Sequence, residues 1–212
     1  MNTEIQLSQT ISRDLVPQTV FKHLAGNGLQ LANQAGGIIN LTVVIPGDAS
    51  ATPSSPMQLS DEYYNLFVVH EDYYDDSSVL VPKDRALTQF GDAAAEFVDK
   101  YGSFTPEAIA VLKTYPCIFA NENHQYGKTD DDHMAYLGII TRLRVQDTGI
   151  KVYFQKLSEF PQQRLNDIAY ELGIKKPKGF NDLNRTHWLL KQIPLIEELD
   201  RAGIPVQFNQ PS

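Results

Sequence analysis

Cysteine is almost absent from this chain, since Cys117 is the only one among 212 residues. A single thiol can form neither an intramolecular disulfide nor a cysteine-based zinc site, and this usage fits a reducing compartment. The first residues lack a basic segment followed by an apolar one, so we expect no secretory signal. Every apolar run is shorter than the roughly 18 residues that a membrane span needs. The sequence therefore predicts a cytoplasmic protein without a membrane partner.

The motifs of several common enzyme classes are missing as well. The chain contains no Gly-x-Gly-x-x-Gly, no P-loop, no Gly-x-Ser-x-Gly and no set of protein-kinase motifs. A nucleotide-cofactor enzyme of a common type is therefore not expected. The sequence leaves open whether the protein is an enzyme, and it indicates no cofactor other than the divalent metal considered below.

Negative charge predominates, but it is unevenly distributed. The net charge of −8 opposes general nucleic-acid binding. Residues 141–191 nevertheless contain ten Lys and Arg against five Asp and Glu, whereas the rest of the chain contains eight against 21. This asymmetry has two interpretations. The basic and acidic parts of the chain could attract one another or simply face solvent, or the basic part could bind an acidic partner.

The composition is that of a folded globular protein, with 42% hydrophobic and 21% charged residues. The hydrophobic patterns predict an α+β fold, in which helices flank a mainly antiparallel sheet of about five or six strands. We expect a sheet domain over residues 1–160 that includes a mobile, proline-rich loop over 46–60. A helical C-terminal segment over 161–212 is expected to pack on the same domain.

Strands are expected where β-branched and aromatic residues cluster or alternate with polar ones. These segments are residues 38–45, 65–70, 79–81, 117–120, 136–145 and 150–157. The second and third resemble a hairpin with a longer loop. Asp147-Thr148-Gly149 predicts a turn between the last two, because glycine readily adopts a positive φ. Each of those two strands alternates between an apolar face and a face with Arg or Lys, which indicates a sheet covered by helices on one side.

Helices are expected where apolar residues recur at helical spacing. These segments are roughly residues 17–32, 84–101, 105–114, 161–172, 181–192 and 194–203. The clearest start is Thr105-Pro106-Glu107, because it combines a capping hydroxyl, a first-turn proline and an acid favoured by the helix dipole. The last two helices are amphipathic, so their apolar faces need the sheet or another chain as a partner.

A polar loop from Asn121 to His133 is the first candidate site for chemistry. Its histidines and carboxylates could bind a divalent metal that activates water for hydrolysis. The candidate ligands are Glu122, His124, Asp130, Asp132 and His133. Their spacing matches neither His-Glu-x-x-His nor an EF-hand. The alternative is a solvated loop whose acids favour solubility, which is the commoner role of a polar connection.

Three smaller candidates have simple structural alternatives. The first is an acidic segment at a strand end, which could supply acid–base groups or metal ligands. The tyrosines within it favour a simple turn instead. It contains His70, Glu71, Asp72, Asp75 and Asp76. Cys117 is expected to be a small buried residue rather than a nucleophile. His187 and Trp188 are expected on a helix. They could form a platform on which a base or ring stacks, but a core tryptophan beside a hydrogen-bonded histidine is the favoured interpretation.

Arg142, Arg144, Lys151 and Tyr153 are expected to share one face of the last hairpin if its strands pair in register. Cations interleaved with an aromatic ring could bind a phosphate-bearing partner, although a solvent-facing sheet has the same pattern. The function favoured by the sequence is a non-catalytic module for protein binding or self-association. The first alternative is a metal-dependent hydrolase using the loop 121–133. The second is nucleotide or nucleic-acid binding through residues 142–156, which the net charge disfavours.

Overall fold

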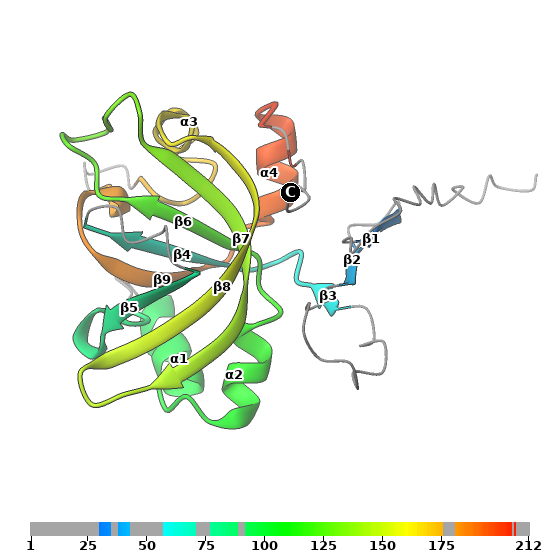
Figure 1. Cartoon of the computed structure of the whole chain (residues 1–212), viewed down its shortest axis with the longest axis vertical. Coiled ribbons are helices and arrows are strands. Elements are labelled where there is room, and N and C mark those ends of the chain that lie inside the picture. The colour runs from blue at the N-terminus through cyan, green and yellow to red at the C-terminus, as the bar shows by residue number, and fades with distance from the viewer. Residues whose placement is uncertain are drawn as a thin grey trace, which may run out of the picture.

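The computed structural model describes residues 30–34, 38–42, 57–70, 77–88, 92–175, 181–204 and 206 (Figure 1). Its main feature is a six-stranded sheet in the order β5 (Ser78–Pro82), β8 (Gly149–Pro161), β7 (Met134–Val145), β6 (Cys117–Asn121), β4 (Tyr64–Val69) and β9 (His187–Lys191). A separate three-stranded antiparallel sheet consists of β1 (Gln30–Gln34), β2 (Ile38–Thr42) and β3 (Met57–Leu59). Four α-helices accompany the sheets in these ranges: α1 (Asp92–Tyr101), α2 (Pro106–Leu112), α3 (Gln163–Asp167) and α4 (Leu195–Arg201).

The six-stranded sheet is mixed and curled. β4 and β6 are parallel, whereas every other neighbouring pair is antiparallel. The two ends of the sheet approach each other: Ala86, four residues after the end of β5, forms an isolated parallel bridge with Trp188 of β9. The N–H of Thr88 also donates to the carbonyl oxygen of Trp188 at 3.1 Å. The curl of the sheet therefore brings the segment after β5 against β9.

The inner face of the curl forms one hydrophobic core with α1 and α2. This core takes side chains from all six strands and is rich in stacked rings; they include Phe67, Val79, Phe119, Ile140, Phe154 and Trp188. A buried asparagine ties its centre together. Asn65 donates to the carbonyl of Leu112 at 3.0 Å and accepts from Nε1 of Trp188 at 3.0 Å. The polar end of the tryptophan is thus satisfied in an apolar environment.

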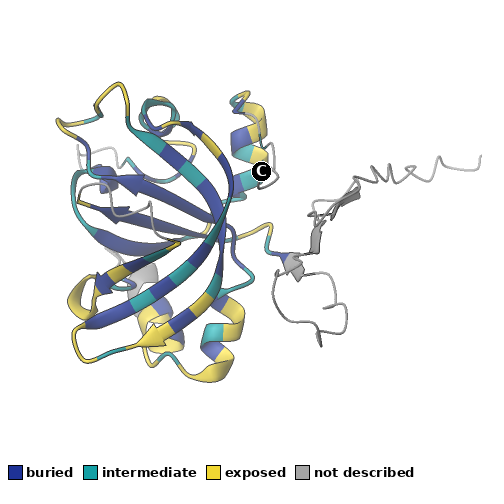
Figure 2. Cartoon of the chain, viewed as in Figure 1, coloured by how far each residue is buried: buried dark blue, intermediate teal, exposed yellow. Residues whose placement is uncertain are grey.

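The described segments that pack on the outer face cover about half of the sheet. α3, α4 and the segment around Ile174 pack on β4, β6, β9 and the first residues of β7 in a second hydrophobic core. Each residue of β4 is therefore buried (Figure 2). The second half of β7 instead contains exposed residues, and the first half of β8 alternates between buried and half-buried residues (Figure 2). Bulges between Leu137 and Gly138 and between Ile140 and Arg142 bend β7 where this change occurs.

The structure confirms the α+β class, but it corrects the arrangement. Five of the six expected strands lie in the six-stranded sheet, whereas residues 38–42 form β2 of the separate sheet. The sheet is mixed rather than mainly antiparallel, because β4 pairs in parallel with β6. Strands β4 and β5 form no hairpin, because β4 pairs with β6 and β9 while β5 pairs with β8. Part of the expected loop 46–60 is the strand β3, and residues 30–32 of the expected first helix lie in β1. The remainder of those two segments lies outside the described residues.

The helices are shorter than expected. Of the described residues in the expected helix 84–101, residues 92–101 form α1, and the helix after Pro161 is reduced to α3. Residues 181–192 form a short 3-10 helix, η2 (Asp182–Asn184), followed by β9, so the C-terminal segment contributes a strand to the sheet. Two starts agree well with expectation: Oγ1 of Thr105 accepts from the N–H of Ala108 at 3.2 Å, and α4 follows Pro194. None of the described helices is long and apolar enough to cross a membrane.

Candidate functional site

Amide side chains fix the loop 121–133 to the rest of the molecule. The side chain of Gln162 donates to the carbonyl of Asn121 and accepts from its N–H, both at 2.7 Å, so it extends the sheet as a backbone would. Asn123 and Asn166 exchange two hydrogen bonds, at 2.9 and 3.0 Å. Gln163 accepts from the N–H of Thr129 at 3.2 Å. The loop is thus part of the packed structure and not merely a solvated connection.

The tip of this loop is a tight turn. The backbones of Gln125 and Lys128 bond to each other in both directions, at 3.1 and 3.2 Å. Gly127 has a φ of +68°, which glycine adopts without strain. Tyr126 beside it is 49% exposed. Lys175 lies 5.8 Å from the centre of the Tyr126 ring, so the turn also contacts the segment that follows α3.

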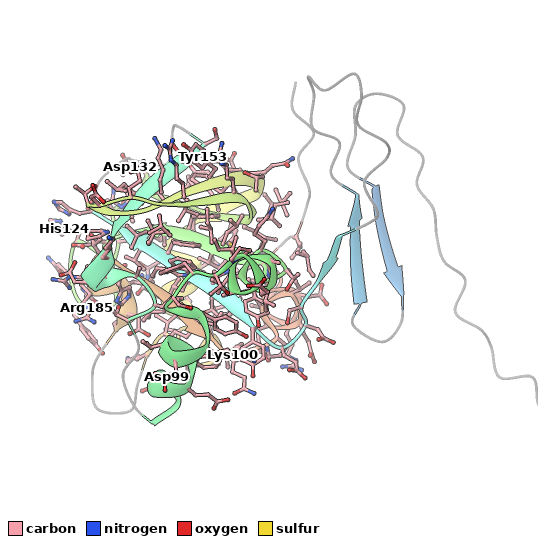
Figure 3. All side chains as sticks on the ribbon, turned by 90° about the horizontal axis from the view of Figure 1, so that it is seen from below. Asp99, Lys100, His124, Asp132, Tyr153 and Arg185 are labelled. Carbon is pink, nitrogen blue, oxygen red and sulfur yellow. The ribbon has the colours of Figure 1, made fainter. Side chains whose placement is uncertain are left out.

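Three of the five metal candidates lie near one another, and the other two lie apart. Asp130 lies between two imidazoles, with Nδ1 of His124 at 3.9 Å and Nε2 of His133 at 3.6 Å from its carboxylate oxygens. Glu122 instead faces His70, and Asp132 is exposed to solvent, as is His124 (Figure 3). Among the described residues, no three His, Cys, Asp or Glu side chains converge as metal ligands.

The ends of β4 and β6 bring His70 and Glu122 together. The N–H of Glu122 bonds to the carbonyl of Val69 at 2.8 Å, which sets the two residues side by side. Nδ1 of His70 lies 3.6 Å from one carboxylate oxygen of Glu122, and the hydroxyl of Thr186 donates to the other at 2.6 Å. The parallel pairing creates this contact, which the sequence did not indicate. The other residues of the acidic segment, Glu71, Asp72, Asp75 and Asp76, lie outside the described residues.

His187 and Trp188 lie on β9, which corrects the expectation of a helix. His187 is fully buried, and its Nδ1 accepts from Nε of Arg185 at 3.2 Å. Burial, followed by the positive charges of Arg185 and Lys191, lowers the pKa of His187 to about 3 against the opposing effect of the Asp182 backbone. Its imidazole is therefore neutral at physiological pH. Its Nε2 makes no hydrogen bond of ordinary geometry to any described residue.

Cys117 is enclosed in the inner core. It has no exposed surface, and burial raises the pKa of its thiol. A reactive cysteine needs a lowered pKa and access to solvent, and Cys117 has neither.

The hairpin of β7 and β8 brings its four candidate residues onto one face. Arg142 is directly opposite Tyr153, and Arg144 is directly opposite Lys151. The cations of Arg142 and Lys151 lie 5.7 and 5.5 Å from the centre of the Tyr153 ring, within the range of cation–π attraction. We call these residues, together with Leu80 of β5, the basic face. Tyr153 lies on the opposite side of the body from Asp99 and Lys100 of α1 (Figure 3).

Leu80 is the member of the basic face that the sequence reasoning missed. It is directly opposite Lys151 in the register of β5 and β8, and 46% of its surface is exposed. The alternation of Val79, Leu80 and Val81 shows that Leu80 faces away from the core. The sequence could not show that Leu80 lies beside the cations, because the pairing of β5 with β8 joins segments about 70 residues apart.

In comparisons with known proteins, no family model, curated protein or solved structure matches the chain.

Proposed function

We propose that this protein is a non-catalytic interaction module, and that its basic face binds an acidic surface of another protein. The observation that supports the proposal most directly is the cross-strand pair of Arg144 and Lys151. Like charges directly opposite each other destabilise a sheet by up to about 1 kcal/mol. A bound carboxylate between the two cations would remove this repulsion.

The surroundings of the pair support an external partner. Neither β5, nor residues 139–145 of β7, nor residues 149–155 of β8 contain an Asp or a Glu. Within the described ranges, Arg142, Arg144 and Lys151 form no ion pair. The charge of the basic face is therefore not neutralised by neighbours of its own strands. Carboxylates from a partner would supply complementary charge, which promotes both specificity and the rate of association.

An exposed apolar side chain and a half-buried aromatic ring accompany the cations. Leu80 is 46% exposed on the basic face. Tyr153 adds a ring held between two cations. Partner-binding surfaces combine such side chains with arginine, since a charged surface alone gains little affinity after desolvation. The net charge of −8 favours a protein partner over a nucleic acid.

The proposal can be tested with poly-glutamate as a probe, with an oligo-deoxythymidine of similar charge in parallel. We expect fluorescence anisotropy to show salt-sensitive binding of poly-glutamate that Arg144→Glu weakens by about tenfold or more. The matched control is Lys100→Glu, an exposed charge reversal on the far side of the body, which should leave the affinity within about twofold.

Two results would overturn the proposal. Equal weakening by both variants would show that poly-glutamate responds to overall charge and not to the basic face. If the oligonucleotide binds more tightly than poly-glutamate, and Arg144→Glu but not Lys100→Glu abolishes this binding, the basic face binds nucleic acid and not an acidic protein.

A further inference from the structure

Among the described strands, the second half of β7 has a neighbour on one side only. Pairing with β8 continues to Val145, whereas pairing with β6 ends at Gly138. The backbone of Ile140 still contacts the thiol of Cys117. Beyond it, no backbone hydrogen bond joins the free side of residues 141–145 to any described part of the chain. With respect to the described part of the chain, these residues form an open strand edge, which we call the β7 edge.

The alternation of an antiparallel ladder decides which groups the β7 edge presents. The N–H of Gln146 donates to the carbonyl of Gly149 at 2.8 Å, so the backbone of Gln146 faces β8. Successive residues face opposite sides, and the N–H and C=O groups of Leu143 and Val145 therefore face outward. The side chains of Arg142 and Arg144 lie on the basic face, and that of Leu143 lies in the inner core.

We propose that the β7 edge binds an extended segment of the partner by strand addition, and that this segment alternates acidic with apolar residues. Strand addition supplies main-chain hydrogen bonds for affinity, and alternate side chains supply specificity. A residue opposite Arg142 or Arg144 would have its side chain on the basic face, where a carboxylate meets the cations. Its neighbours would face the other side, where Val145 is 48% exposed.

Charge also explains why a second copy of this chain is not the occupant. Two β7 edges paired with each other would place Arg142 and Arg144 of both copies side by side, and cations on an edge are a common protection against such pairing. The same cations attract an acidic strand. The β7 edge is thus protected against self-association and open to a segment of opposite charge.

This inference rests on the proposed function, and its test separates the two. The probe is a decapeptide that alternates Glu and Val, with blocked ends. In antiparallel addition the valine amides face Leu143 and Val145, while the glutamate amides face away. We expect N-methylation of the valine amides to abolish binding. A peptide with N-methylated glutamate amides has the same charge and should bind within about threefold of the parent.

Hydrogen exchange gives an independent readout. Binding of the decapeptide should slow exchange at the N–H groups of Leu143 and Val145, because they acquire acceptors in the added strand. Arg144→Glu should weaken binding by about tenfold, and Lys100→Glu should have little effect.

Each outcome decides between the two proposals. If both methylated peptides bind as well as the parent and Arg144 is still required, strand addition is wrong while the acidic partner stands. If the parent peptide does not bind and poly-glutamate does not bind either, both proposals fail. Formation of dimers by the unaltered protein, without peptide binding, would assign the β7 edge to self-association.

Discussion

Acidification should destabilise the protein through His187, because this imidazole is buried in its neutral form. Its pKa is about 3 in the folded chain, against about 6.5 for an exposed histidine in the unfolded chain. Between these values the unfolded state binds one more proton than the folded state. The stabilisation is therefore fully present above the unfolded pKa and is lost as the pH falls from about 6.5 towards 3.

The size of the effect follows from the two pKa values. At full protonation of the unfolded state, the free energy of unfolding falls by about 1.4 kcal/mol for each pH unit. From about pH 7 to about pH 4.5 the loss amounts to about 2.5 kcal/mol. This is a large share of the ~5–15 kcal/mol that stabilise a typical domain.

Urea denaturation at a series of pH values would measure this loss, with His187→Gln as the reference. The glutamine side chain of that variant does not titrate, so carboxylate protonation alone should determine the pH dependence of its stability. We expect the wild-type curve to fall more steeply below pH ~6, by about 2.5 kcal/mol in total. If both proteins lose the same stability between pH ~7 and ~4.5, then His187 is not held neutral by burial and the reasoning is refuted.

Three further predictions concern buried polar groups and the loop 121–133. Asn65→Leu removes the acceptor of the Trp188 N–H and should lower the free energy of unfolding by about 2–3 kcal/mol, measured by urea denaturation; an effect below about 0.5 kcal/mol would contradict it. Gln162→Ala should speed hydrogen exchange at the N–H of Asn121, because that group loses its acceptor, and unchanged exchange would show that the amide contact is dispensable. Zn²⁺, Mg²⁺ or Mn²⁺ should not raise the melting temperature of chelator-stripped protein, since no described group of three ligands converges, whereas a saturable rise that His124→Ala abolishes would revive the metal hypothesis.

Local patterns in the sequence predicted the parts of the fold that depend on neighbouring residues. The alternation in β7 and β8 and the glycine at 149 indicated the hairpin, and its register then placed Arg142 opposite Tyr153. Thr105 and Pro106 marked the start of α2 for similarly local reasons. The members of the basic face contributed by β7 and β8 could therefore be named from the sequence, although their function could not.

The missed features depend on contacts between distant segments. β9 was expected to be helical because a strand buried on both faces lacks the alternation that distinguishes it from a buried helix. The parallel pairing of β4 with β6 leaves no trace in either strand. Gln162 resembles any surface glutamine in the sequence, yet it bonds to Asn121 as a neighbouring strand would.

The position of β9 has a consequence for the order in which the protein folds. Asn65 of β4 bonds to Cys117, which lies 52 residues further along, and to Trp188, which lies 123 residues further along. During synthesis, both edges of β4 can therefore be paired only after nearly the whole sheet has been made. Until β9 arrives, the nascent chain exposes an apolar strand with an unpaired edge, which is the kind of surface that chaperones bind and that aggregates when they do not. A ribosome that stops before His187 would release a product that is prone to degradation, even though it contains every residue of the basic face.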